Sequence, residues 1–137
     1  MATLQQAIEQ IQGVVRGLDR MRAAPIKPPE EIAAFPFAVC YSEAGDYEWG
    51  SMIMKGLHTI VIEIHVARKD LPRDYERAMT FAKSVPNAIF AAIPDTLTAI
   101  VTVNTINYTF GPMAYADVET LGFRFRLEGV KTEDAIA

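Results

Sequence analysis

The sequence predicts an α+β domain with the order helix-strand-strand-helix-strand-strand, in which helices pack on one face of a mixed or antiparallel sheet. Three observations lead to this prediction. Residues 3–22 carry apolar side chains at intervals of three and four, whereas residues 56–67 alternate with period two. The stretches 99–110 and 118–128 have the composition of long strands. The length of 137 residues suits one domain, so we expect a single domain over 1–137.

The first helix is predicted over residues 3–22, because its apolar side chains trace a single stripe. Gly13 and Gly17 lie in the same helix, and their spacing indicates close packing on a neighbouring element such as a sheet. Residues 23–36 contain four prolines, which predicts a largely irregular connector. The stripe consists of Leu4, Ala7, Ile8, Ile11, Val14, Val15, Leu18 and Met21.

Two strands are predicted after the connector. Residues 37–41 form a continuous apolar run, as expected for a strand that is covered on both faces. The alternation in residues 56–67 places one set of side chains inward and the other outward. We therefore expect Ile60, Ile62 and Ile64 to form the inward face of a central strand.

The second helix is predicted to begin near Arg73. Asp70 stands at a suitable N-cap position, and Pro72 lies in the first turn, where a missing N–H does no harm. Pro86 is expected to kink or end this helix. A further short turn is expected over residues 87–93.

The last two strands are predicted at residues 99–110 and 118–128, joined across Gly111 and Pro112. Alternate positions of the second one are apolar and polar, so one face should be buried and the other wet. Residues 129–137 are expected to form a short flexible tail at the C-terminus.

The composition is that of a globular protein and disfavours several classes of function. Half of the residues are hydrophobic and 22% are charged, which argues against a disordered chain. A net charge of −4 provides no basic field, so we expect no sequence-specific binding to nucleic acid. Cys40 is the only cysteine, which excludes an intrachain disulfide and a thiolate cluster and favours a reducing compartment. The start of the chain does not resemble a signal peptide, and no uncharged run is long enough for a bilayer, so we expect a cytoplasmic protein without a membrane partner.

Residues 42–55 are predicted to form a long, mobile loop that carries large apolar side chains. A contiguous exposed apolar patch usually marks an interface, and aromatic residues and methionine are enriched in interface cores. The alternative is that the segment folds back as a β-hairpin onto its own core. The candidate interface residues are Tyr47, Trp49, Met52, Ile53 and Met54.

No catalytic, cofactor or metal site is predicted. His58 and His65 are seven residues apart in one strand, so they should point to opposite faces and cannot share a metal ion. Each is interpreted as an imidazole at the strand end or on the surface. Glu43, Asp46 and Glu48 lack the spacing of a calcium loop and are interpreted as solvated. A small enzyme that uses one histidine with these carboxylates is the competing hypothesis, beside a module that binds a ligand between helices and sheet.

Four blocks of the sequence carry a resemblance to a known family: GLHTIVIEIHVARKDLPRDYERA, SVPNAIF, INYTFGPM and ETLGFRFRL. These blocks resemble small tail-terminator or tail-completion proteins of long-tailed bacteriophages and prophages, and the resemblance covers roughly residues 35–127. It implies an α+β subunit that assembles as a ring, commonly a hexamer, on the head-proximal end of the tail tube. Such a ring stops growth of the tube and helps to join the tail to the head. Other head-tail connector proteins and minor tail proteins of similar size remain the alternative.

The resemblance also implies the partners and the location of the protein. The partners would be other copies of the chain, the tail tube protein and a head-completion or connector protein, with DNA passing through the ring. The location would be the virion, and the host cytoplasm during assembly. The resemblance carries over no catalytic residue and no cofactor, so we expect a structural protein and not an enzyme.

Overall fold

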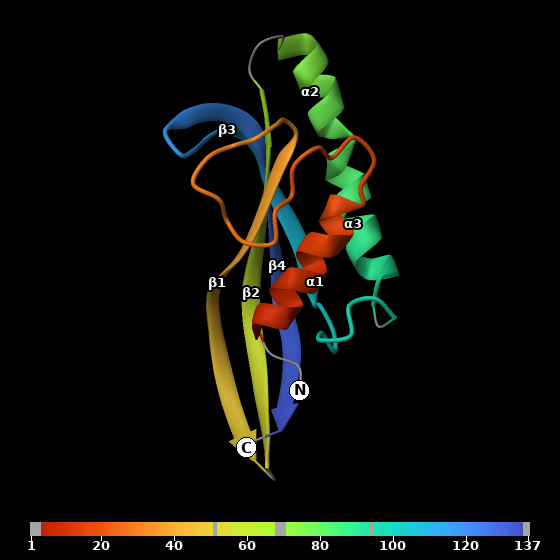
Figure 1. Cartoon of the computed structure of the whole chain (residues 1–137). Coiled ribbons are helices and arrows are strands. Elements are labelled where there is room, and N and C mark those ends of the chain that lie inside the picture. Colours follow the sequence, from red (N-terminus) through yellow and green to blue (C-terminus); the bar gives the residue numbers. More distant parts are fainter. Residues whose placement is uncertain (1–3, 51, 68–70, 94, 136–137) are drawn as a thin grey trace.

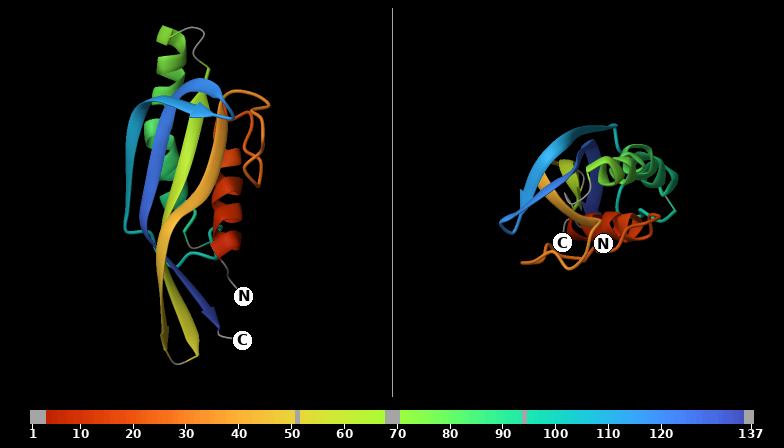
Figure 2. Two further views of the ribbon diagram at one scale, coloured as in Figure 1. Left: turned by 90° about the vertical axis from the view of Figure 1, so that its left-hand side faces the viewer. Right: turned by 90° about the horizontal axis from the view of Figure 1, so that it is seen from above.

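The computed structural model describes residues 4–50, 52–67, 71–93 and 95–135. Its four strands form one antiparallel sheet in the order β1-β2-β4-β3, which confirms the α+β class (Figures 1 and 2). The predicted second helix consists of two helices that meet at Thr80. The elements are α1 (Leu4–Arg16), β1 (Phe37–Gly50), β2 (Ile53–Val66), α2 (Leu71–Met79), α3 (Phe81–Ala91), β3 (Thr105–Tyr115) and β4 (Val118–Ala135).

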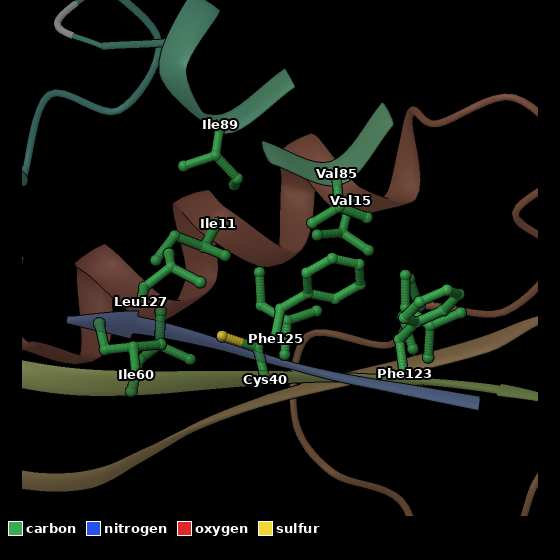
Figure 3. Packing of buried hydrophobic residues seen from close by; sticks show 14 of the residues in the cluster. Ile11, Val15, Cys40, Ile60, Val85, Ile89, Phe123, Phe125 and Leu127 are labelled. Atoms are coloured by element: carbon green, nitrogen blue, oxygen red, sulfur yellow. The ribbon is translucent and has the colours of Figure 1, made fainter. Parts of the chain in front are cut away.

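The hydrophobic core lies between one face of the sheet and the helices α1 and α3 (Figure 3). Ile60, Ile62 and Ile64 are fully buried in it, as the alternation of β2 predicts. In the sheet register they lie opposite alternate apolar residues of β4, so the two central strands present one continuous apolar face. The opposing residues are Leu127, Phe125 and Phe123, and the helices cover them with Ile11, Val15, Val85 and Ile89.

The helices differ from the prediction in three places. α1 ends at Arg16 and not at residue 22, and a Cβ added at Gly13 would meet no atom within 4 Å, so this glycine does not serve close packing. Pro86 lies inside α3, whose buried residues on either side hold the helix against the core through the proline. α2 begins at Leu71, close to the predicted position, whereas Asp70 lies outside the described residues.

The edge strand β3 is shifted along the chain relative to the prediction. It begins at Thr105. The chain before it is irregular, with Ala99 and Ile100 buried over the core and Val101 exposed, and a bridge between Thr102 and Lys131 joins it to β4. Pro112 lies within β3, where a missing N–H is tolerated because the outer side of an edge strand has no partner strand. The turn falls instead at Ala116 and Asp117, which both have positive φ, as a two-residue hairpin turn of this hand requires.

Two segments expected to be irregular are strands. Residues 42–50 and 53–55 are the paired ends of β1 and β2, so they form a β-hairpin and not a long loop. β4 continues to Ala135, so residues 129–135 do not form a tail. Neither segment was predicted as a strand, because glycines interrupt the alternation of apolar and polar residues and glycine has a low strand propensity.

Candidate functional site

The three strands β1, β2 and β4 continue beyond the helices as a narrow projection, which we call the blade. It consists of residues 44–50, 53–59 and 130–135, and Figures 1 and 2 show it extending past α1 and α3. Irregularities in both ladders mark where it leaves the body, at Ser42 to Ala44 and at His58 to Ile60. β3 does not continue beside it, because its pairing with β4 stops at Glu128. Val130, at the base of the blade, still belongs to the hydrophobic core, whereas the rest of the blade extends past the helices that cover the body of the sheet (Figure 1).

One face of the blade gathers three of the five predicted interface residues. Trp49 pairs directly with Met54, and Tyr47 stands two residues along the same strand, so the three side chains share a face. The side chain of Trp49 is 79% exposed and that of Tyr47 is 53% exposed. Large apolar surface of this kind, held on a paired sheet, is typical of an interface that another molecule covers.

The other two predicted residues lie elsewhere at the tip. Met52 is in the turn, with φ at 68°, and Ile53 pairs with Gly50 on the opposite face of the blade. Leu57 stands on that same face and is 53% exposed, although the sequence did not single it out. The sequence did contain a signal for Leu57, because it is an apolar residue at an outward position of an alternating strand. The blade thus carries apolar side chains on both faces, and the hairpin does not bury them in its own core.

His58 holds the base of the blade and is not the surface imidazole that the sequence suggested. Its ring is buried and packs across two glycines, and a Cβ added at Gly45 or Gly56 would lie 2.4 Å or 2.3 Å from a ring nitrogen. The edge of the Tyr47 ring approaches it, with centroids 5.1 Å apart, and Nε2 lies 3.1 Å from Oγ1 of Thr132. Burial lowers the pKa of His58, so the neutral ring serves as a packing element that joins the three strands.

The other face of the body holds a buried polar cluster around Glu63. His65 is fully buried, which corrects the prediction of an exposed imidazole, and its two nitrogens lie 3.0 Å from Oε1 of Glu63 and 2.6 Å from Oγ1 of Thr120. Tyr41 donates its hydroxyl to Oε2 of Glu63 at 2.5 Å, and Arg124 donates to the same oxygen at 3.2 Å. Both carboxylate oxygens and both ring nitrogens are thereby engaged, which suits a structural network that ties β1, β2 and β4 together.

The cluster holds Glu63 in its ionised form. Burial alone raises the pKa of this carboxyl, but hydrogen bonds from His65 and Tyr41 and the charge of Arg124 outweigh burial and lower the pKa from 4.5 to about 2. Burial and the hydrogen bond to Glu63 also raise the pKa of Tyr41 to about 12, so its hydroxyl remains a donor at neutral pH. Glu63 therefore accepts hydrogen bonds and does not exchange a proton near neutrality.

This arrangement predicts a loss of stability in acid. The pKa of Glu63 is lower in the folded protein than in the unfolded chain, so the carboxylate stabilises the fold fully above its unfolded value of 4.5, and this contribution is lost as the pH falls toward 2. In urea unfolding at pH 7, Glu63→Gln should be less stable than the wild type by on the order of 3 kcal/mol. The difference should shrink steadily between pH 5 and pH 2. Parallel stability curves for the two proteins over that range would contradict the proposed network.

Two further findings concern metal binding and membrane-spanning helices. Within the described residues, no three side chains among histidine, cysteine, aspartate and glutamate are grouped so that they could hold a metal ion. No helix in the same part of the chain is both long and apolar enough to cross a membrane. Comparison of the sequence with models of known protein families and with curated proteins gives no match.

Proposed function

We propose that the protein is a structural virion component, a tail terminator of a long-tailed phage or prophage. In this proposal it forms a homo-oligomeric ring, commonly a hexamer in proteins of this kind, at the head-proximal end of the tail tube. The ring stops growth of the tube and helps to join tail to head. Its partners are its own copies, the tail tube protein and a head-completion or connector protein, with DNA passing through the opening.

The observation that carries the proposal is the blade. Its paired strands and the buried ring of His58 give it a defined shape. It presents Tyr47 and Trp49 to solvent, with Met54 half-buried on the same face. A stable monomer gains nothing from a projection with exposed aromatic side chains, whereas a subunit of an assembly can bury them against a neighbour. In a ring of identical subunits, each subunit contacts its two neighbours through two unlike patches. The projecting apolar patch of the blade can serve as one of these two.

The same blade would also serve another head-tail connector or a minor tail protein, which is the alternative within the same class. An enzyme is a weaker candidate, because the two histidines are both buried and engaged in packing or hydrogen bonding. A ligand-binding module would place its pocket between helices and sheet. That space is filled by apolar side chains in this fold (Figure 3).

Two measurements test the proposal. Light scattering and negative-stain images of the purified protein should give a ring with a central opening and a mass that is a multiple of the 15.2 kDa subunit. A phage that lacks the protein should produce heads and tails that do not join, with tails of irregular length. Normal virions from that phage would exclude the function, and a monomer with no ring at any concentration would exclude self-assembly in the absence of the tail tube.

A further inference from the structure

The helical half of the molecule carries a second candidate surface, at a distance from the blade. A pocket of about 450 Å3 lies where the turn after α1, the end of the connector and the junction of α2 and α3 meet. Three arginines and two phenylalanines are among the residues that line it. The lining residues are Arg20, Arg22, Phe35, Pro36, Arg77 and Phe81.

The three arginines of this pocket have exposed side chains that the structure leaves without hydrogen bonds or ion pairs to any described residue. Arg124 and Arg126 differ, since each binds a glutamate. Three guanidinium groups around one hollow repel each other, and carboxylates or phosphates placed among them would relieve that repulsion. The pocket therefore has the charge of a binding site for an anionic group.

The pocket also has an apolar part, which narrows the choice of ligand. Phe81 is buried beneath it, and Phe35 and Pro36 are only partly covered. A small inorganic anion would leave the apolar part of the pocket exposed to water. A segment that offers a carboxylate together with an aromatic ring would satisfy both parts, because arginine binds carboxylates and also stacks on aromatic faces.

The tip of the blade offers this combination. Glu48 and Trp49 are adjacent in β1 and exposed on opposite faces of the blade, with Lys55 opposite Glu48 in the register. Both border a hollow of about 260 Å3 at the tip, so a pocket that receives the tip end-on would meet both side chains. Asp46 is exposed nearby, and the charged residues of the blade comprise four acids and two lysines. The acids are Asp46, Glu48, Glu133 and Asp134, and the lysines are Lys55 and Lys131. The blade is therefore negative where the pocket is positive.

We propose that the pocket of Arg20, Arg22 and Arg77 receives the acidic, aromatic blade tip of a second copy of this chain. The pocket lies at the junction of α2 and α3, whereas the tip lies at the far end of the molecule, so a chain cannot fill its own pocket (Figure 1). Tip and pocket are unlike surfaces, so each copy offers both halves of the contact and the contacts can continue around a ring. This inference adds a specific interface to the proposed function, and it rests on the ring that the proposed function assumes.

Charge reversal tests the contact. Arg77→Glu and Glu48→Lys should each weaken association between copies by about tenfold or more, measured by sedimentation velocity at low salt. The double variant should regain most of the lost association, because the reversed pair can form again. Lys83→Glu changes the charge equally on an exposed position of α3 outside the pocket, and it should assemble like the wild type. Melting curves of all four variants confirm that they are folded.

A second measurement locates the contact without depending on charge. A chain carrying both Glu48→Cys and Arg77→Cys should form a ladder of covalent multimers on mild oxidation, while each single variant should stay monomeric, because its thiol would face no cysteine of the next copy. Oxidation that yields only monomers from the double cysteine variant would overturn the proposal, and so would rings in which Arg77→Glu has no effect. In the latter case the ring, and with it the proposed function, would stand with a different interface.

Nucleic acid is the competing occupant of the pocket. A labelled DNA duplex should not bind the purified protein in a way that depends on Arg77. Binding that Arg77→Glu abolishes, with assembly unchanged, would assign the arginines to phosphate groups and overturn the docking of the blade tip. A protein that stays monomeric, in a phage that assembles normally without it, would instead remove the proposed function itself.

Discussion

Replacing Ile62 with aspartate is expected to unfold the protein. Ile62 is fully buried at the centre of the sheet, where it pairs with Cys40 on β1 and with Phe125 on β4 beneath the helices. The carboxylate would have no cation within this apolar face, and an unpaired buried charge destabilises a domain by about 4 kcal/mol or more. That is a large fraction of the roughly 5–15 kcal/mol by which a domain of this size is stable.

Urea unfolding and thermal melting measure this effect, and Ile62→Val is the matched control. The valine variant removes one methylene group and should lose only about 1 kcal/mol. An aspartate variant that melts at the temperature of the wild type would show that the register of β2 is wrong, because the side chain at position 62 would then face solvent.

Replacing Trp49 with alanine is expected to disrupt assembly while leaving the fold intact. The side chain is 79% exposed and the described residues barely cover it, so its removal should change the free energy of unfolding by no more than about 0.5 kcal/mol. In an assembled ring the same side chain would lie in an interface, where truncation of a central tryptophan weakens each contact by about 2 kcal/mol or more, about thirtyfold. The loss is multiplied around a closed ring, because every contact carries the same change.

Light scattering at several concentrations, together with melting curves, separates the two effects. Phe90→Ala is the matched control, since Phe90 is an exposed aromatic residue, 48% exposed, that belongs to α3 and not to the blade. Equal assembly of the tryptophan variant and the wild type would remove Trp49 from the interface. A fall of many degrees in its melting temperature would show that Trp49 is a packing residue of the blade.

The sequence by itself determined the core face of the protein. The alternation at Ile60, Ile62 and Ile64 and the stripe of α1 each follow a local period, and a local period reports which side of an element is buried. The sequence also indicated that the large apolar residues near Trp49 form a surface that another molecule covers.

The tertiary structure decided that residues 44–50 and 53–55, expected to lie in a loop, are paired strands of the blade. From the local sequence, Gly45 and Gly56 would be expected to interrupt a strand. Both nevertheless lie within paired strands, because the ring of His58 occupies the space that a side chain at either position would fill. The burial of His65 likewise depends on Thr120, a partner 55 residues away. No local pattern contains such a contact.

The division between Tyr47, Trp49 and Met54 on one face and Ile53 and Leu57 on the other also came only from the register of the strands. The arginine pocket depends on packing even more, because its residues come from three segments of the chain, and both β1 and β2 lie between the second segment and the third. Periodicity predicts which way a side chain points from its own element. Which distant side chains then meet depends on how the elements pack, and in this protein that packing created the blade and the pocket.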